Sequence, residues 1–502
     1  MGSVGTTDTI VSLPDNKNAW SCSSLPATTD RKPVTEQHVS DLRNALKEID
    51  EGSVLLVPGD DGYEESLKRW SRAAEKRAGA VLLSKTPSAI AKALRYASEH
   101  TIDLAVRGGG HSTAGASSTS GGLVIDLSSM RSVTVDPTAK TLAIQGGAQW
   151  SDVDDAAWEH GLATVGGTVA DTGVGGLTLG GGYGWLSGTH GLVIDNLISC
   201  EIVLASGEIV RASNDENTDL FWALRGGGQN FGVVTEFILQ AWKQHHVWAG
   251  LVGFPTEKLA DILDVLNETI LAMNGRGACA LGFARPPPAG GQVLVIIPVF
   301  YDGSEEEGQA GFKRLLDLAP IMNTATSVPY NSVNRMLDAP QGRRVSMKGA
   351  SFTLPLRFDF VKSTMDAYAR FTSEIPDSQE SLLLYEIFDP AKICEVANHE
   401  TSFANRGTRM NAMVGPIWTS PEHDARSRAW AREVADMFKV ELARDKGSDG
   451  KGEGLGVYGN YDQYDEKSRD IFGGNYARLQ ELKARYDPGN MFNKLFSVAP
   501  AV

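Results

Sequence analysis

Three glycine-rich segments constrain what this chain can fold into more than any other feature. They span residues 107–112, 173–184 and 225–232, and each lies beside an apolar run that predicts a β-strand. One glycine cluster usually marks a tight turn. Backbone without Cβ atoms can, however, approach a ligand closely and donate N–H groups to phosphate oxygens. Three such clusters favour loops around a long, phosphate-bearing cofactor.

The surroundings of the first segment argue against a Rossmann fold. The strand-like run 104–106 follows a predicted helix, which begins at Thr86 and Pro87 because threonine caps helices and proline favours their first turn. After this strand, residues 113–122 form a Ser/Thr/Gly loop that leads directly into the strand-like run 123–127. The glycines of a Rossmann motif open a helix instead.

Length and charge exclude several classes of protein. At 502 residues the chain is expected to form two domains, and its net charge of −15 argues against nucleic-acid binding, which needs a dense basic surface. No run approaches the roughly 18 apolar residues of a membrane span. The N-terminus lacks the pattern of a signal peptide. We expect a cytoplasmic monomer with no membrane contact, and a secreted mature form remains open.

Metal and disulfide sites are not expected. The four cysteines are far apart and form no CxxC pair, which predicts neither a zinc site nor a disulfide framework. His190 and His399 have no partner at metal-ligand spacing. We therefore expect no catalytic metal.

Taken together, the glycine-rich segments resemble a known family. R-G-G-G-H-S at 107–112, a G-V-G-G block ending in G-G-G-Y-G at 173–184, and R-G-G-G-x-N-F-G-V-V-T at 225–235 follow one another here. The same order is typical of the berberine bridge enzyme-like branch of the vanillyl-alcohol-oxidase superfamily. Residues 475–492 resemble the closing helix and tail of that family, so the resemblance covers essentially residues 50–502.

The resemblance implies an α+β fold. It consists of a PCMH-type FAD-binding domain, made of two α/β subdomains, and a substrate domain with an antiparallel sheet backed by helices. Strand-like runs at 292–300 and 381–388, separated by long helical stretches, agree with this. The expected parts are an N-terminal extension at 1–50, the FAD-binding domain at 51–245, the substrate domain at 246–464 and a C-terminal segment at 465–502 that returns to the FAD-binding domain.

The same resemblance implies that FAD is bound covalently. Family members link FAD from the histidine of the first segment, here His111, and many add a bond from a cysteine whose position falls on Val169. Valine forms no thioether, so a single bond through His111 is expected, which raises the flavin potential and prevents loss of the cofactor. The alternative is that His111 only caps a loop. In relatives, the residue three places after the cysteine gates oxygen, and here the small Thr172 leaves access open.

Most of the other expected cofactor contacts lie in the glycine-rich segments. Arg107 is expected to supply positive charge, and the glycines, with Ser112 and Asn230, to cradle the pyrophosphate and the flavin edge. Any single glycine can instead serve only a turn. The expected contacts, besides His111, are Arg107, Gly108, Gly109, Gly110, Ser112, Gly115, Val169, Thr172, Gly173, Gly175, Gly176, Gly180, Gly182, Asn230, Gly232, Val233 and Asn460.

Glu386 is the first candidate for a catalytic base. In such oxidations a hydride leaves a C–H bond for flavin N5 while a base removes a proton from the attached oxygen or nitrogen. Glu386 lies in the otherwise apolar run 382–388, where burial raises the pKa of a carboxyl group, and strand alternation turns Tyr385 to the opposite face. The segment also resembles one in the family that carries an active-site glutamate or glutamine. A surface-facing or salt-bridged glutamate is the alternative.

Tyr458 and Tyr183 are the other catalytic candidates. In an extended segment 457–461, alternation places Tyr458 and Asn460 on one face, as in the family's Y-x-N motif. Tyr183 occupies a position that in relatives looks into the pocket. Core packing is the alternative for Tyr458, and Tyr183 is expected to be a substrate contact.

The predicted function is an FAD-dependent oxidase of an alcohol, sugar or amine-type small molecule, which is reoxidised by O2 and releases H2O2. A flavoprotein dehydrogenase or an oxidative cyclase of secondary metabolism is the first alternative. A pericyclase or binding protein that uses the fold without redox chemistry is the second. Oligosaccharide oxidases of the family that the chain resembles tend to carry the double link and an open groove, so the resemblance, with no cysteine at position 169, implies smaller or aromatic substrates.

Overall fold

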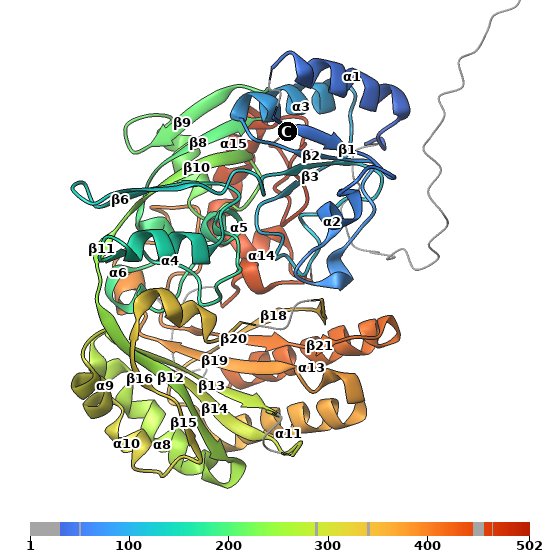
Figure 1. The fold of residues 1–502 in the computed structure, drawn as a ribbon. Helices are drawn as coiled ribbons and strands as arrows, with labels where there is room; N and C mark the ends of the chain where they lie inside the picture. The colour runs from blue at the N-terminus through green and yellow to red at the C-terminus, as the bar shows by residue number, and fades with distance from the viewer. Residues whose placement is uncertain are drawn as a thin grey trace, which may run out of the picture.

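Helices and strands are combined in two lobes, one above the other in Figure 1. The computed structural model describes residues 31–49, 52–286, 290–338, 342–444, 456–463 and 465–501. The expected α+β fold is confirmed, because the chain forms mixed and antiparallel sheets covered by helices. No helix among these residues is both long and apolar enough to cross a membrane.

A four-stranded sheet forms the N-terminal part of the upper lobe, with the strand order β1-β2-β4-β3. Strand β4 pairs in parallel with both β2 and β3, as expected when a helix connects β2 and β3. Helix α3 (Pro87–Glu99) is this helix, and the side chain of Thr86 caps it by accepting a hydrogen bond from the Ala89 N–H. The strands are β1 (Val54–Leu56), β2 (Ala80–Leu83), β3 (Leu104–Arg107) and β4 (Leu123–Asp126), and helix α1 (Glu36–Lys47) precedes them.

A five-stranded antiparallel sheet, of order β5-β6-β10-β8-β9, completes the upper lobe. Its loops carry the second and third glycine-rich segments, which open α5 and follow α7. The strands are β5 (Val133–Asp136), β6 (Thr141–Gln145), β8 (Leu197–Leu204), β9 (Ile209–Ser213) and β10 (Gly232–Gln240). The helices are α4 (Trp150–Trp158), α5 (Val174–Leu179) and α7 (Thr218–Leu224).

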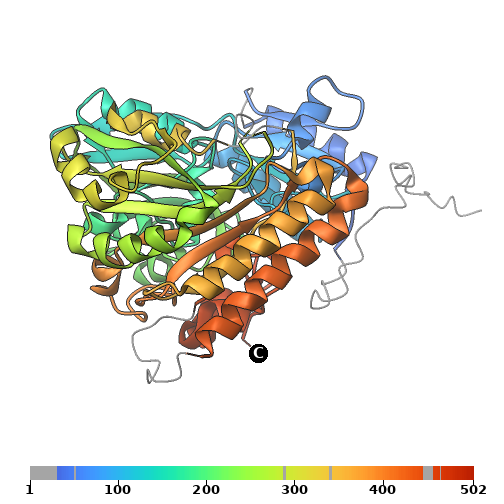
Figure 2. The ribbon, with the colours of Figure 1, turned by 90° about the horizontal axis from the view of Figure 1, so that it is seen from below.

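The lower lobe is built on an eight-stranded sheet whose main order is β15-β12-β14-β13-β19-β20-β18, with β16 also paired to β12. Helices α8, α11 and α13 cover one face, and α11 and α13 run side by side across it in Figure 2. The strands are β12 (His246–Pro255), β13 (Gly277–Ala284), β14 (Leu294–Tyr301), β15 (Met322–Asn323), β16 (Thr326–Pro329), β18 (Lys348–Phe352), β19 (Leu382–Phe388) and β20 (Met410–Gly415). The helices are α8 (Leu259–Thr269), α11 (Phe358–Glu374) and α13 (Asp424–Leu442).

Short elements connect these layers. They are α2 (Tyr63–Leu67), α6 (Ser187–His190), α9 (Glu305–Gly311), α10 (Lys313–Leu316), α12 (Ala391–Cys394), β7 (Leu162–Ala163), β11 (Trp242–Lys243), β17 (Arg344–Val345) and β21 (Ile417–Trp418).

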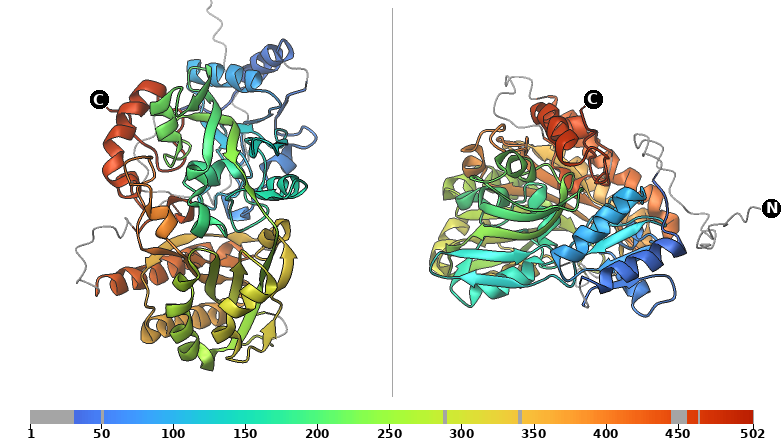
Figure 3. Two further views of the ribbon diagram at one scale, coloured as in Figure 1. Left: turned by 90° about the vertical axis from the view of Figure 1, so that its left-hand side faces the viewer. Right: turned by 90° about the horizontal axis from the view of Figure 1, so that it is seen from above.

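The C-terminal helices α14 (Ser468–Phe472) and α15 (Tyr476–Tyr486) lie against the upper lobe, where Figure 3 shows them in red. A buried ion pair holds this segment: the Nζ of Lys483 lies 2.7 Å from Oδ2 of Asp487. Lys483 also donates to the backbone oxygens of Asn230 and Phe492. The chain end is thereby fixed to the third glycine-rich segment. The domain boundaries expected from the sequence stay predictions.

Replacing Lys483 by methionine is expected to destabilise the protein by about 3–5 kcal/mol, because the buried Asp487 carboxylate loses its positive partner. Urea unfolding measures the change in the free energy of unfolding. Arg314→Met is the matched control, because Arg314 pairs with Glu268 on the surface, where removing a pair costs about 1 kcal/mol or less. Equal losses in the two variants would contradict a stabilising role for Lys483.

Candidate active site

One large cavity, of about 480 Å³, lies between the glycine-rich loops of the upper lobe and the sheet of the lower lobe. All three glycine-rich segments contribute to its lining, as do β19 and the chain around Tyr458. Its size falls in the range of small-molecule and cofactor sites. The three segments singled out in the sequence therefore meet at one place.

Two glycine-rich loops touch backbone to backbone in this cavity. A Cβ atom on Gly109 would lie 2.5 Å from Cα of Gly173, and a Cβ on Gly173 would lie 2.5 Å from the nitrogen of Gly109. Real Cβ atoms do not approach other atoms so closely, so both positions require glycine. Gly110 has φ of +72°, a left-handed conformation that glycine adopts without strain.

The first glycine-rich loop presents unused hydrogen-bond donors. The backbone N–H groups of Gly109, Gly110, His111 and Ser112 donate to no described residue. The buried hydroxyl of Ser117, which also lines the cavity, has no hydrogen-bond partner among the described residues. A buried donor without a partner, such as the Ser117 hydroxyl, is costly, and phosphate oxygens would satisfy both it and the amides of the half-buried loop. These residues therefore fit the pyrophosphate of FAD.

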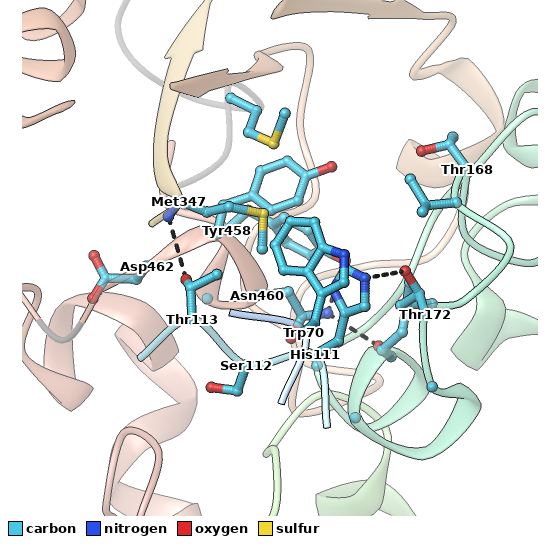
Figure 4. A pocket seen from close by; sticks show the side chains of 18 of the residues that line it. Trp70, His111, Ser112, Thr113, Thr168, Thr172, Met347, Tyr458, Asn460 and Asp462 are labelled. Carbon is cyan, nitrogen blue, oxygen red and sulfur yellow. Dashed lines mark hydrogen bonds between the residues drawn. The ribbon is translucent and has the colours of Figure 1, made fainter. Parts of the chain in front are cut away.

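His111 is held on two sides. Its Nε2 lies 3.1 Å from Oδ1 of Asp171 and 3.4 Å from Oγ1 of Thr172, and its ring stacks on Trp70 with the ring centroids 4.0 Å apart (Figure 4). A neutral histidine that donates from Nε2 to a carboxylate carries its lone pair on Nδ1. The surroundings thus orient the ring and favour Nδ1 as the nucleophilic atom.

Most expected cofactor contacts line the cavity. Val169 and Thr172, which the sequence resemblance placed at a second covalent link and at an oxygen gate, lie there together with the other lining residues. From the expected set, the lining residues are Gly108, Gly109, Gly110, His111, Ser112, Val169, Thr172, Gly173, Gly175, Gly176, Gly180 and Asn460.

Six expected contacts, namely Arg107, Gly115, Gly182, Asn230, Gly232 and Val233, do not line the cavity. The guanidinium of Arg107 pairs with Asp126, 2.6 Å away, so its charge is neutralised within the sheet. The side chain of Asn230 bonds to the backbone of Gly227, Phe496 and Val498 and holds the chain end. Gly232 and Val233 form ladder pairs of β10 with β8.

Glu386 faces the cavity, as strand alternation predicts, while Tyr385 packs into the core beneath the helices. The carboxylate of Glu386 is buried and accepts hydrogen bonds from the hydroxyls of Tyr183 and Tyr461, the latter over 3.1 Å. Burial raises the pKa of Glu386 to about 7, although both phenol bonds act in the opposite direction. Near neutral pH this carboxyl group can take up or release a proton.

Tyr458 and Asn460 lie together, but the extended segment expected around them is wrong. Residues Gly459–Tyr461 form a 3-10 turn. This turn brings the side chains into contact: Nδ2 of Asn460 donates to the Tyr458 hydroxyl over 2.9 Å and to the backbone oxygen of Leu177 over 3.1 Å. Burial raises the pKa of Tyr458, so its phenol stays protonated at neutral pH.

A buried ion-pair network anchors this turn to the lower sheet. On β18, the Nζ of Lys348 lies 2.6 Å from Oδ2 of Asp462 and 3.1 Å from Oε1 of Glu466. The hydroxyl of Ser346 donates to Oε1 of Gln463. The position of Tyr458 and Asn460 is thus set by both lobes.

Three functional candidates were missed in the sequence: Trp70, Asp171 and Tyr461. Tyr461 directly follows Asn460 of the Y-x-N motif, and only the 3-10 turn brings its hydroxyl to Glu386. Asp171 directly precedes Thr172 in the sequence, and this neighbouring position is the signal that could have identified it. Trp70 lies in no motif. The described residues hold no group of three or more His, Cys, Asp or Glu side chains that could bind a metal ion.

Known families match two parts of the chain. The FAD binding domain family matches residues 78–213, and the family described as berberine and berberine like matches residues 457–498. The second match contains Tyr458 and Asn460, so both families include residues of the cavity.

Curated relatives match along nearly the whole chain. The FAD-linked oxidoreductase pgmH of Aspergillus terreus is 32% identical over 95% of this chain and 98% of its own length. The FAD-linked oxidoreductase hasG of Aspergillus fumigatus is 31% identical over 89% of this chain and 97% of its own length.

Solved structures share the fold at lower identity. 6-hydroxy-D-nicotine oxidase from Arthrobacter nicotinovorans has a TM-score of 0.74 at 23% identity, with 90% of this chain and 99% of that chain covered. Xylooligosaccharide oxidase from Myceliophthora thermophila, in complex with xylobiose, has a TM-score of 0.77 at 20% identity, with 93% and 99% covered. A berberine bridge enzyme variant in complex with (S)-reticuline has a TM-score of 0.77 at 18% identity, with 93% and 99% covered.

Gly180→Ala is expected to conflict with Asn460, because a Cβ atom on Gly180 would lie 2.0 Å from its Oδ1. The conflict should cost about 1–3 kcal/mol of the free energy of unfolding. In an Asn460→Ala background the same substitution should cost less than half as much, because the opposing amide is gone. Urea unfolding of the four proteins of this double-mutant cycle measures the coupling, and additive losses would contradict the contact.

Proposed function

The chain belongs to the berberine-like family of FAD-linked oxidoreductases, and we propose that it holds FAD by one covalent bond from His111 and oxidises an alcohol, sugar or amine-type small molecule. The observation that carries the proposal is that Glu386 and His111 line the same cavity. The proposed proton acceptor and the proposed attachment point of FAD therefore face the same cavity. The partners of the reaction are the small-molecule substrate and O2.

The single covalent bond is supported by what surrounds His111. Asp171 and Thr172 face Nε2, which leaves Nδ1 as the nucleophile, and Trp70 fixes the plane of the ring. Val169 lines the same cavity and offers no sulfur for a second link. The amides of residues 109–112 would hold the phosphate oxygens of the cofactor.

Glu386 is the proposed base. When bound, FAD supplies the acceptor for a hydride from the substrate carbon. Glu386 takes the proton from the substrate oxygen or nitrogen, so that C–OH becomes C=O with the loss of two electrons and two hydrogens. Each oxygen of Glu386 accepts one phenol bond and keeps a second lone pair for the substrate.

Tyr458 is the proposed positioning group for the substrate. Its oxygen accepts the bond from Asn460, so its own proton is free to be donated to a substrate oxygen. Because burial raises the pKa of Tyr458, the phenol is a donor rather than a base at neutral pH. Glu386 and Tyr458 thus have different roles.

O2 is the proposed final acceptor, taking two electrons and two protons to become H2O2. Thr172, with a small side chain, lies in the lining close to His111. From the sequence, the small side chain at this position is expected to let O2 reach the flavin.

His111→Ala should abolish covalent attachment. In the unmodified protein, yellow flavin is expected to stay with the acid-precipitated protein, and in the variant to remain in the supernatant. Asp171→Asn, which keeps the nucleophile but weakens control of the tautomer, should leave only part of the flavin bound covalently. Absorbance of pellet and supernatant measures both. Flavin that stays in the His111→Ala pellet would contradict the proposal.

Glu386→Gln should slow flavin reduction by about 10²–10⁴-fold, the usual loss when a general base is removed. In the unmodified protein the rate should rise with pH through a pKa of about 7, because only the ionised carboxylate accepts a proton, and this rise should vanish in the variant. Anaerobic reduction by the most active compound of a panel of alcohols, sugars and amines measures the rate. Admitting air then tests the acceptor, since slow reoxidation without H2O2 would contradict an oxidase.

Asp154→Asn is the matched control for this pH profile. Asp154, on α4, is also buried, burial also raises its pKa to about 7, and it does not line the cavity. The pH-dependent rise should persist in this variant. If Glu386→Gln retains the rise, Glu386 is not the base.

A further inference from the structure

The cavity floor beyond Glu386 is the face of the lower sheet that the helices leave uncovered. Along β19, Leu382, Leu384 and Glu386 line the cavity, whereas Leu383 and Tyr385 pack in the core with the helices. Glu386 is therefore the first residue of a row that continues along the floor with aliphatic side chains.

The residues paired with these leucines on the neighbouring strands widen the floor. Leu384 pairs with Gly282 on β13 and with Met413 on β20, and Leu382 pairs with Gly415. A strand advances about 3.3 Å per residue, so the floor is apolar for about 13 Å from Glu386 to Leu382. The larger apolar side chains of the floor are Leu251, Ile296, Pro298, Leu382, Leu384 and Met413.

Charge is nearly absent from this floor. Among the described lining residues there is no lysine or arginine, and every lining carboxylate has a partner in the protein, which for Glu386 is a pair of uncharged phenols. An anionic substrate would find no counter-charge here, and a cation would compete with existing bonds. The other partnered carboxylates are Glu380 with Arg343, Asp462 with Lys348, and Asp338 with the backbone N–H of Ala170.

The polarity of the cavity is therefore divided. The hydroxyls of Tyr183, Tyr458 and Tyr461 surround Glu386 at one end, and aliphatic and thioether side chains line the floor from Leu384 to Leu382. A sugar lying on that floor would lose the water bonds of several hydroxyls without replacement, whereas ring carbons gain from leaving water. Met336, Met347 and Met413 add thioethers, which adapt to and contact aromatic rings well.

We propose that this site takes an uncharged, largely apolar aromatic compound that presents one alcohol group, on a saturated carbon that carries at least one hydrogen, to Glu386 and Tyr458 and lies over Leu384 and Leu382. The proposal rests on the proposed function and specifies its substrate class. Oxidation of such a compound removes a hydride from the carbon that carries the hydroxyl, to FAD, and the hydroxyl proton, to Glu386.

A larger residue at Gly415 would shorten the apolar floor, and a Cβ atom at this position makes only ordinary contacts. A Cβ atom there would lie on the side of Leu382 Cβ, 3.9 Å away, and would meet Met413 Cε at 3.6 Å, an ordinary contact. A leucine at this position would occupy space at the end of the floor remote from Glu386. Gly474→Leu is the matched control, because a Cβ on this exposed glycine meets nothing within 4 Å.

Binding of 2-naphthol and cellobiose to the holoprotein tests the proposal. 2-Naphthol has an apolar ring and one hydroxyl but no hydrogen on the hydroxyl-bearing carbon, so it binds without being oxidised. Flavin absorbance and tryptophan fluorescence report binding independently of turnover. We expect 2-naphthol to bind at least about 100-fold more tightly than cellobiose, and Gly415→Leu to weaken its binding about tenfold or more. Gly474→Leu should change neither constant.

The outcomes separate this inference from the proposed function. Cellobiose binding as tight as that of 2-naphthol, or an unchanged 2-naphthol constant in folded Gly415→Leu, would overturn the substrate class. If Gly415→Leu does not fold, the ratio of the 2-naphthol and cellobiose dissociation constants in the unmodified protein tests the substrate class alone. Flavin reduction by cellobiose without 2-naphthol binding would overturn the class and leave the oxidoreductase intact. Tight 2-naphthol binding without flavin reduction by 2-naphthylmethanol supports the class and contradicts the oxidation.

Discussion

Backbone contact between Gly109 and Gly173 fixes the surroundings of His111, on which the proposed attachment of FAD depends. The contact leaves no room for a Cβ atom on either residue, so the first and second glycine-rich segments meet at a fixed distance. His111 follows Gly109 by two residues, and Asp171 and Thr172 directly precede Gly173. The hydrogen bonds that orient His111 therefore depend on two loops that are far apart in the sequence. Any side chain at the contact would separate the imidazole from its carboxylate partner.

Burial of Glu386 is the second constraint, and it is shared between the lobes. The carboxylate comes from β19, while its phenol partners come from the second glycine-rich segment and from the turn at residues 459–461. Low polarity around the carboxyl group raises its pKa, and the two phenols keep the ionised form accessible near neutral pH. The buried pair of Lys348 and Asp462 holds the turn in place. The environment that raises the pKa of Glu386 thus depends on how the two lobes are fixed to each other.

Local signals in the sequence predicted the parts of the site that depend on a single element. The cap at Thr86 predicts α3, and alternation along β19 predicts which side of the strand Glu386 faces. Contacts between residues of different helices, strands or turns could not be predicted from the sequence. Tyr461 reaches Glu386 only because a 3-10 turn replaces the expected extended segment, and Arg107 pairs with Asp126 on the neighbouring strand. A motif indicates the part of the site in which a residue lies. The side chain with which that residue forms a hydrogen bond or ion pair depends on which strand or turn lies beside it in the fold.

The solved structures that share this fold show why the fold alone does not identify a substrate. A xylooligosaccharide oxidase bound to xylobiose and a berberine bridge enzyme variant bound to (S)-reticuline superpose on this chain about equally well. Proteins solved with two different ligands therefore share this backbone arrangement, so the fold does not specify the substrate, and the side chains around a site must do so. In this chain those side chains are aliphatic or thioether groups next to one buried carboxylate. On the proposed substrate class, selectivity would arise from the water that the substrate gives up: a hydroxyl group finds partners at the Glu386 end, whereas the side chains of Leu384, Leu382 and Met413 favour apolar carbon.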